Sequence, residues 1–453
     1  MLYFLEKFNS CFISIGIFPI IIFLGGLLTW KLRCLQFTGL KLGFKLMVSN
    51  KQSSCGEGQV SRYEVVAGIL AGNFGTGNIA GMAVAIACGG PGALVWVWVG
   101  TLLGAIVQYS GSFLGVKYRK FHNRVGEFIG GPAACLAYGM GSKFLASLFC
   151  IFTIITAFSA GNCVQINCIV PLCSDNTFIK IVLGILIALI VVPVLIGGNH
   201  RILRFSAKAI PFIAGFYIIS CFIILAQNSA QIFPAVKLIL SSAFGVKATV
   251  AGLSGYTLTQ VLSTGMSRAI MATDCGSGMV SILQSDSRSN NPVMDGLVTL
   301  LPPLIVSTVC SITMLVLLVS GAYTSGREGT LMVLHAFTSS LGSLGGGIVI
   351  IAMTLFGYTT ILTWFACAEK SLAYMIPGKR ANLWLKFLYV MITPLGGVID
   401  MRLIWGLADT GFIGMVVLNS IALIALIKDV LETNQQVSLL KLERDCGVET
   451  VQR

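Results

Sequence analysis

The amino-acid sequence predicts an all-α integral membrane protein, and three observations support that prediction. Of the 453 residues, 56% are hydrophobic and only 10% are charged, whereas about 25% of the residues of a soluble globular protein are charged. The mean hydropathy is +0.89, and many apolar runs are long enough to cross a hydrocarbon core of about 30 Å. The alternating short strands of an outer-membrane β-barrel are absent from the sequence.

The apolar runs predict eleven transmembrane helices. The first run follows Glu6 and Lys7 and lacks a small-residue cleavage site. We therefore interpret it as a true helix rather than as a secretory signal peptide. In chain order, the predicted spans are residues 11–30, 63–87, 92–116, 143–170, 178–197, 209–227, 247–284, 295–320, 343–367, 384–400 and 404–427.

The basic residues orient these spans. The net charge is +13, and 23 of the 30 lysine and arginine residues fall in segments on one side of the predicted spans. Cytoplasmic loops are enriched in basic residues, so we expect the N-terminus outside and the C-terminus in the cytoplasm. This explanation requires no nucleic-acid partner. The fourteen cysteines form no C-x-x-C pair and mostly lie in apolar runs, so neither a zinc site nor a disulfide framework is predicted.

Two spans are interrupted by glycines and short polar residues. The interruptions are Ala71–Asn78 in the second span and Thr273–Gly278 in the seventh. Because they are five spans apart, the two helices cross in opposite directions, as an inverted repeat of spans 2–6 and 7–11 requires. The predicted parts are an extra N-terminal helix with its cytoplasmic loop (1–62), a first five-helix repeat (63–228), an extracellular connection (229–246), a second repeat (247–427) and a cytoplasmic tail (428–453).

A helix break within the bilayer frees backbone groups that a ligand can satisfy. The N-terminus of a half-helix can hold a carboxylate, and freed carbonyl oxygens can coordinate Na⁺. The alternative is close helix packing, since Gly68 and Gly72, and likewise Gly77 and Gly81, have small-xxx-small spacing. Packing does not account for the polar residues between these glycines, which are Asn73, Thr76 and Asn78.

Other polar residues within the spans each have two interpretations. Asp274 is the one carboxylate deep in a predicted span; it either pairs with Arg268 or takes part in ion coupling. Gln165 faces the protein interior and either binds a ligand or bonds a neighbouring helix. Thr359 and Thr360 either coordinate an ion or bond their own helix.

Several motifs resemble the sodium:alanine/glycine symporter family. They are Gly75–Gly81, the run Gly89-Gly-Pro-Gly-Ala93 and the pair Trp96-Val-Trp98. More distantly, the broken second span resembles the first core helix of the LeuT-type fold. This chain departs from the family pattern at Thr273–Met279, where the family usually has N-E-A-G-L-G-S, and at Val97, Gln108 and Gly111.

The resemblance implies a LeuT-type 5+5 fold with the substrate between the two breaks. It implies that backbone around Gly75, Thr76 and Gly77 binds the substrate carboxylate, that further contacts come from Gly276, Ser277 and Gln165, and that Trp364 lies near the pocket. It also implies a Na⁺ ion held by carbonyl oxygens of the first break, near Gly72 and Asn73, together with Thr359 and Thr360.

We therefore expect a secondary transporter of the bacterial cytoplasmic membrane that carries a small neutral amino acid, alanine or glycine, inward with Na⁺ and without an organic cofactor. A proton-coupled or exchanging permease of the same fold, with Asp274 titrating, is the alternative. A membrane-embedded enzyme is disfavoured because the three histidines, His122, His200 and His335, fall in loops or near span ends. The sequence does not predict the oligomeric state.

Overall fold

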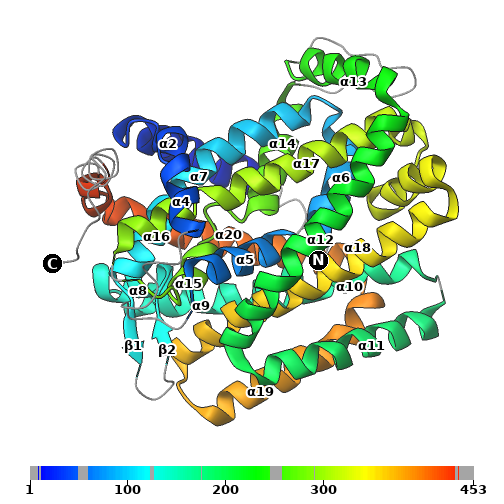
Figure 1. Cartoon of the computed structure of the whole chain (residues 1–453). Helices are drawn as coiled ribbons and strands as arrows, with labels where there is room; N and C mark the ends of the chain where they lie inside the picture. The colour runs from blue at the N-terminus through cyan, green and yellow to red at the C-terminus, as the bar shows by residue number, and fades with distance from the viewer. Residues whose placement is uncertain are drawn as a thin grey trace.

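The computed structural model describes residue 9, residues 12–48, 60–122, 127–174, 176–244, 258–289 and 291–433, and residue 437. Within these residues the chain is helical except for connecting turns and one antiparallel hairpin, formed by β1 (Lys120–His122) and β2 (Glu127–Ile129) (Figure 1). The expected start of the seventh span at 247 and most of the expected tail after 433 lie outside the described residues.

The first half of the chain contains one interrupted helix and several long continuous ones. The capping box at Ser61 and Glu64 begins α5, because each residue's side chain accepts a hydrogen bond from the other's backbone N–H. The elements of this half are η1 (Ile13–Ile17), α2 (Phe18–Lys31), α3 (Leu35–Thr38), α4 (Leu40–Val48), α5 (Arg62–Asn73), α6 (Thr76–Gly89), α7 (Ala93–Lys117), α8 (Pro132–Ala134), η3 (Cys135–Gly139), α9 (Lys143–Phe158), η4 (Ser159–Cys163), α10 (Val164–Ile169), η5 (Val170–Leu172), α11 (Thr177–Ile196) and α12 (Gly198–Gln227).

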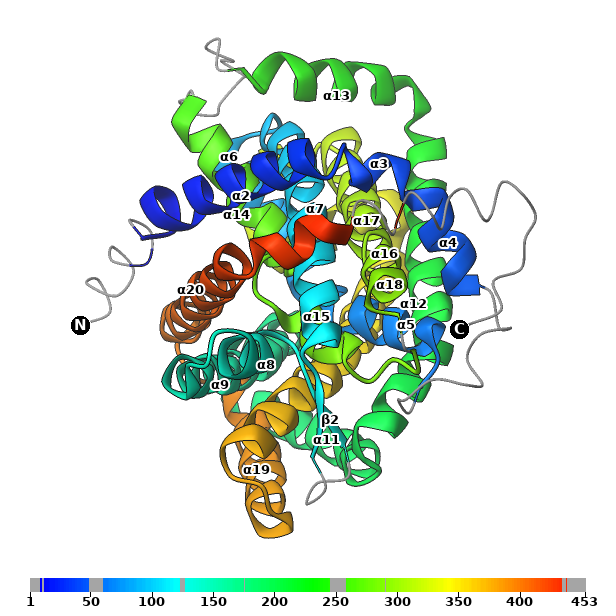
Figure 2. The same ribbon diagram turned by 90° about the vertical axis from the view of Figure 1, so that its left-hand side faces the viewer.

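The second half begins with a peripheral helix, α13, which lies along one edge of the molecule in both views (Figures 1 and 2). Gly342 interrupts α18, because its φ of 63° is in the left-handed region. The elements of this half are α13 (Ser229–Ser242), α14 (Leu258–Thr273), α15 (Met279–Gln284), α16 (Pro292–Val298), α17 (Leu301–Val319), η6 (Ala322–Thr324), α18 (Gly329–Met375), α19 (Lys379–Ile392), η7 (Thr393–Gly397) and α20 (Met401–Ala425).

Seven of the described helices are long and apolar enough to cross a membrane, and the bent pair α5–α6 makes an eighth. The other predicted spans correspond to shorter or interrupted helices: α2, α14 with α15, and α19. The segment 198–208, expected as a loop, is helical instead. This segment is the first part of α12, which continues without a break into the apolar span that follows. Its basic residues therefore lie on a helix that extends beyond the apolar stretch.

The centre of the fold is built on close helix approaches. Helix α7 packs against α14, and α18 packs against α5, α6, α9 and α12. At Gly104 of α7 an added Cβ would lie 2.6 Å from the Cβ of Cys275, and at Gly265 of α14 it would strike the carbonyl oxygen of Ala93. Glycine at these two positions lets the helix backbones approach closely enough to hold the second break against α7.

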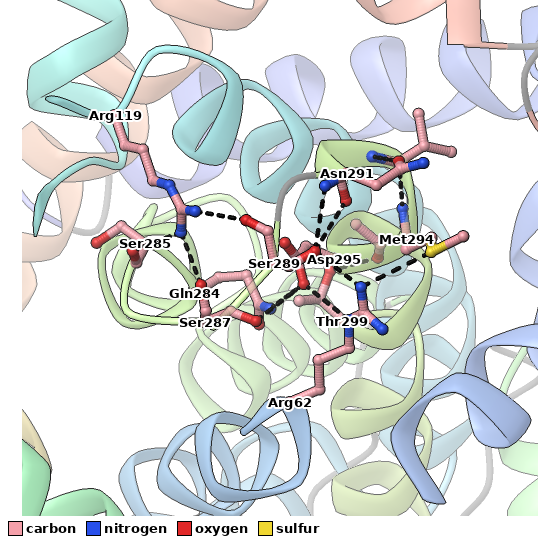
Figure 3. A network of polar contacts seen from close by, with 12 residues as sticks. Arg62, Arg119, Gln284, Ser285, Ser287, Ser289, Asn291, Met294, Asp295 and Thr299 are labelled. Carbon is pink, nitrogen blue, oxygen red and sulfur yellow. Dashed lines mark hydrogen bonds and ion pairs between the residues drawn. The ribbon is translucent and has the colours of Figure 1, made fainter. Parts of the chain in front are cut away.

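A polar network joins four elements at one end of this core (Figure 3). The Nε of Arg62, on α5, lies 3.2 Å from Oδ1 of the fully buried Asp295 on α16. Ser287 donates a hydrogen bond to the same oxygen at 2.9 Å, and Arg119 donates to the backbone carbonyls of the turn at residues 285, 287 and 289. The turn between α15 and α16 is thereby fixed to the ends of α5 and α7.

A second buried ion pair extends this network to α18. The Nζ of Lys370 lies 2.6 Å from Oδ1 of Asp286, and each side chain is 3% exposed. Lys370 also donates to Oγ of Ser285 at 2.8 Å and to the carbonyl oxygen of Ile282 at 3.2 Å. We use the name inner network for Arg62, Arg119, Asp286, Asp295 and Lys370 with the turn that they hold.

Removing one partner of the inner network should destabilise the protein. Asp295→Ala leaves the guanidinium of Arg62 buried without its counter-charge, which costs about 3–5 kcal/mol. Chemical unfolding in detergent measures this loss. The matched control is Arg204→Gln, which removes an exposed pair with Glu64 at 3.8 Å and should change the free energy of unfolding by less than about 1 kcal/mol. Equal effects of the two substitutions would contradict this account.

Candidate functional site

The first break separates α5 from α6. Only Phe74 and Gly75 lie between the two helices, whose axes differ by 43°. Gly75 has extended backbone angles and offers no side chain to cap α6. The break therefore presents the N-terminus of α6 to the interior of the protein, with the positive end of the helix dipole directed there.

Gln165 supplies the missing cap from a different helix. Its Oε1 accepts hydrogen bonds from both the backbone N–H and the hydroxyl of Thr76, each at 2.9 Å. Its Nε2 donates to the carbonyl oxygen of Ala160 at 2.9 Å, within the π-helical turn η4. The next N–H of α6, that of Gly77, has no hydrogen-bond partner among the described residues. One donor at this helix end is therefore available to a ligand.

The second break is the turn Asp274–Gly278 between α14 and α15. Three of its residues have positive φ: Asp274 at 50°, Gly276 at 87° and Gly278 at 85°. Ser277 stabilises the turn because its N–H and its hydroxyl both donate to the carbonyl oxygen of Asp274, at 3.1 and 2.8 Å. The left-handed conformation is unusual for a residue other than glycine, so Asp274 is a strained position at the centre of the fold.

Side-chain amides connect the two breaks and satisfy their free carbonyl groups. Asn73 donates from Nδ2 to the carbonyl oxygen of Thr273 at 3.1 Å. Asn78 donates to the carbonyl oxygen of Asn73, and Asn419 of α20 donates to that of Gly276 at 2.8 Å. The two interrupted helices thus contact each other directly.

The threonines of α18 differ in what they contact. Thr360 donates from Oγ1 to the carbonyl oxygen of Ala71 at 3.0 Å, across to the first break. Thr359 donates to the carbonyl oxygen of Phe356 at 3.0 Å, on its own helix. The structure therefore brings Thr360, and not the hydroxyl of Thr359, to the carbonyl groups freed by the break. The sequence did not point to Ala71, because the atom that Thr360 contacts is its backbone carbonyl oxygen, and every residue has one.

A cavity of about 50 Å³ lies between the breaks. We call it the central cavity. Trp364 and Phe412 form one wall, with ring centroids 5.6 Å apart in an edge-to-face arrangement. Of the residues selected from sequence, those that line it are Gly72, Asn73, Gly75, Gly77, Asn78, Gln165, Arg268, Asp274, Thr360 and Trp364, whereas Thr76, Thr359, Gly276 and Ser277 lie behind its surface.

The two glycine pairs of the second span serve different purposes. A Cβ at Gly68 would strike Leu203, and one at Gly72 would strike Met279, so this pair permits helix packing. At Gly77 a Cβ would meet no described atom within 4 Å, and at Gly81 the nearest is Cδ of Arg268 at 3.8 Å. Gly77, which lines the central cavity, therefore faces open space, whereas a Cβ at Gly81 would be in ordinary contact with Arg268.

Asp274 and Arg268 do not form an ion pair among the described residues, so the internal pairing considered from sequence is not formed. The left-handed backbone at Asp274 ends the helical register that would relate the two side chains. Both residues line the central cavity, and Arg268 also lines a second cavity together with Asp409 of α20. Met271 and Phe412 also line the central cavity; as apolar and aromatic residues on apolar spans, they carried no signal in the sequence. Trp405, which lines it too, belongs with Asp409 to the residues that resemble the symporter family.

Comparison with known proteins identifies the family. The family model described as the sodium:alanine symporter family matches residues 2–441. The chain belongs to the sodium:alanine symporter family. This confirms the resemblance drawn from the glycine motifs and places the protein among transporters rather than enzymes.

Named relatives cover nearly the whole chain. The sodium/alanine symporter AgcS of Methanococcus maripaludis is 32% identical over 412 residues, which is 89% of each chain. The putative sodium/proton-dependent alanine carrier protein YrbD of Bacillus subtilis is 32% identical over 94% of this chain and 90% of its own. The probable sodium/glutamine symporter GlnT of the same organism is 28% identical over 88% of this chain and 83% of its own.

Solved structures support the fold of this sodium:alanine symporter family member. A Na⁺-coupled sialic acid symporter superposes with a TM-score of 0.52 at 13% identity, covering 86% of this chain and 82% of that one. A manganese transporter of Eremococcus coleocola gives 0.54 at 14% identity, covering 81% and 78%. The protein is thus an all-helical, multi-span membrane protein similar to LeuT-fold transporters.

Proposed function

We propose that this protein carries a small neutral amino acid, alanine or glycine, into a bacterial cell together with Na⁺ by alternating access. The proposal rests on the central cavity, which lies between the two broken helices and is lined by residues of both breaks. The volume of this cavity is about 50 Å³, and one enclosed water molecule needs about 10–15 Å³. The cavity therefore has room for a few water molecules, which suits a small amino acid better than a bulky one.

In the proposed complex the substrate carboxylate binds at the N-terminus of α6. The backbone there, at Gly75, Thr76 and Gly77, combines the free N–H group of Gly77 with the positive end of the helix dipole. Gln165 already places an amide oxygen on the N–H of Thr76 at 2.9 Å, which supports the binding of an oxygen ligand at this end of the helix. Gly276 and Ser277 contribute by shaping the turn that exposes Asp274 to the cavity, and Trp364 closes the opposite wall.

In the same proposal Na⁺ binds between α5 and α18. The oxygen atoms already facing each other are Oγ1 of Thr360 and the carbonyl oxygen of Ala71, 3.0 Å apart. Backbone carbonyls of Gly72 and Asn73, and Thr359 after rotation of its hydroxyl, complete the proposed ligand set. These are hard, neutral oxygen ligands of the type that alkali cations bind in discontinuous helices.

The proposed architecture contains eleven spans in two inverted repeats of five after one extra helix. Helices α2, α14 with α15, and α19 are then spans that are short or broken. The basic asymmetry across the loops supports a periplasmic N-terminus and a cytoplasmic C-terminus. With that orientation the inner network lies on the cytoplasmic side, where its buried ion pairs would close the pathway from the cell interior.

A proton-coupled permease is the second candidate, because Asp274 lines the central cavity and is 4% exposed. A carboxylate without a counter-charge at that depth is costly when ionised. Under this alternative Asp274 binds and releases the coupled proton, and Thr360 only bonds Ala71.

Uptake of radiolabelled alanine into proteoliposomes, with Na⁺ and pH gradients imposed separately, distinguishes the two candidates. We expect accumulation under the Na⁺ gradient alone. Thr360→Val should raise the Na⁺ concentration for half-maximal uptake about tenfold, the effect of 1.4 kcal/mol on an affinity. The control Thr363→Val removes a hydroxyl that bonds only the carbonyl oxygen of Thr359, on its own helix, and should change it little. An unaltered Na⁺ requirement in Thr360→Val, with uptake driven by pH, would contradict the proposal.

Gly77→Leu should abolish uptake while leaving the protein folded and inserted. A Cβ at Gly77 meets no described atom within 4 Å, so the backbone accepts a side chain there, but the leucine side chain fills the space where the substrate must reach the helix end. The control is Gly347→Leu, an exposed position where a Cβ also meets no described atom within 4 Å. Uptake by Gly77→Leu at wild-type affinity would show that Gly77 does not face the substrate.

A further inference from the structure

Helices α3 and α4 present a face that combines basic and apolar side chains. Both helices lie in the segment expected as a cytoplasmic loop, and Figure 2 shows them at the periphery of the molecule. On their outer side, Phe37 is 55% exposed, and Phe44 and Val48 are each 58% exposed. Lys41 and Lys45 are exposed between them. We call these five residues the basic face.

The basic face belongs to an amphipathic helical segment. Its members recur at intervals of three and four residues, at which the side chains of a helix are neighbours. The junction between α3 and α4 keeps the helical hydrogen bonds, since the N–H of Gly39 donates to the carbonyl oxygen of Leu35 at 2.8 Å and that of Gly43 to the carbonyl oxygen of Gly39 at 2.9 Å. On the opposite side, Leu35, Leu42 and Leu46 are buried. The segment thus has one side packed on the protein and one side exposed.

A turn separates the basic face from the preceding span. Arg33 and Cys34 follow α2 and have φ of 53° and 55°, in the left-handed region that is uncommon for residues other than glycine. Two successive residues in this region end the right-handed helix. Helices α3 and α4 therefore do not prolong α2, but lie directly after it, on the side that the proposed orientation assigns to the cytoplasm.

The positive charges of this segment have no acidic residue beside them in the sequence. Residues 31–48 contain four basic residues, Lys31, Arg33, Lys41 and Lys45, and neither aspartate nor glutamate. Within the described part of the chain, Lys41 and Lys45 form no ion pair within 4.0 Å. Clusters of this kind next to a span or on an amphipathic helix favour anionic lipid head groups. The positive-inside rule accounts for the charges, but the exposed phenylalanines beside them favour a membrane surface over a soluble anion.

Helix α4 also contacts the helix that carries part of the inner network. Gly43 approaches α16 so closely that an added Cβ would lie 2.5 Å from the carbonyl oxygen of Leu297. Gly39 makes a similar approach, because a Cβ there would lie 3.0 Å from Cδ2 of the same leucine. Leu297 follows Asp295 by two residues on this helix of seven residues. A shift of α4 is therefore transmitted by direct contact to the buried pair of Asp295 and Arg62.

We propose that the basic face binds the head groups of anionic phospholipids in the cytoplasmic leaflet, and that this binding holds α4 against α16 and so stabilises the inner network. Lys41 and Lys45 bind the phosphate groups, while Phe37, Phe44 and Val48 insert beside the acyl chains. The inference uses the proposed orientation but is independent of which solute and which ion are carried. Lipid composition thus acts on the cytoplasmic side of the pathway without contact with the substrate.

Photo-crosslinking of the full-length protein tests the lipid site. The protein is reconstituted with a photoactivatable phosphatidylglycerol or with the matching phosphatidylcholine, and the crosslinked peptides are quantified by mass spectrometry. Phosphatidylglycerol should label residues 35–48 at least threefold more than phosphatidylcholine does, because only its head group carries a net negative charge. Combining Lys41→Gln with Lys45→Gln should abolish this preference. Both side chains are exposed, so the double lysine variant should fold.

Lys237→Gln is the matched control. Lys237 is an exposed lysine on the peripheral helix α13, near the exposed side chains of Phe233 and Leu240, but it is the one basic residue of that helix. This variant should keep the preference at residues 35–48. Equal labelling of these residues by the two lipids in the wild type, or an unchanged preference in the double lysine variant, would overturn the lipid site.

Hydrogen–deuterium exchange tests the link to the inner network. In the wild type, phosphatidylglycerol should slow exchange of the peptide that covers α16 at least threefold relative to phosphatidylcholine, and the double lysine variant should lose this effect. Gly43→Ala separates binding from coupling, because the added Cβ pushes α4 away from Leu297. It should keep the crosslinking preference and lose the effect on exchange.

Exchange of the α16 peptide that is the same in both lipids, beside a clear crosslinking preference, would overturn the link between the basic face and the inner network. Neither readout measures transport. Failure of this inference and failure of the proposed Na⁺-driven uptake are therefore distinguishable.

Discussion

The need to satisfy backbone groups at two helix breaks governs the centre of this protein. A free N–H or carbonyl group within the hydrocarbon region costs several kcal/mol unless protein or ligand binds it. Gln165 satisfies the first turn of α6, and Asn73 and Asn419 satisfy carbonyl groups of the second break. What remains available is the N–H of Gly77 and the oxygens at Thr360 and Ala71, and these define the proposed substrate and Na⁺ positions.

The two ends of the proposed pathway differ in how their charged side chains are arranged. The inner network places two buried ion pairs, Arg62 with Asp295 and Lys370 with Asp286, around one turn. At the opposite end, Arg268 and Asp409 stand apart beside a cavity of about 760 Å³. Under the proposed orientation, the two ion pairs lie on the cytoplasmic side and this cavity lies on the periplasmic side. Under the proposed cycle, opening toward the cytoplasm must separate these two buried ion pairs, and a buried charge without its partner is costly. The binding of substrate and Na⁺ must then supply part of the free energy of that step.

Sequence patterns predicted the helical class, both breaks and the family, because these depend on composition and on local glycine and polar residues. They did not show which glycines pack and which face the cavity, since Gly68 and Gly77 have the same spacing to a second glycine and differ only in their neighbours. The absence of an ion pair between Arg268 and Asp274 among the described residues also required the structure, because the left-handed turn at Asp274 redirects the chain. Span boundaries differ where a helix extends beyond its apolar run, as α12 does. They also differ where one predicted span is divided between two shorter elements, as at η1 with α2 and at α19 with η7.

The central claim is that one substrate molecule and one Na⁺ ion occupy the same pair of helix breaks. Reciprocal binding measurements on the purified protein test it most directly. The dissociation constant of alanine is measured by calorimetry with and without saturating Na⁺. That of Na⁺ is measured in the same way with and without saturating alanine. The account predicts that each ligand tightens the other by the same factor, on the order of 10-fold or more. Alanine binding that does not respond to Na⁺ would contradict it.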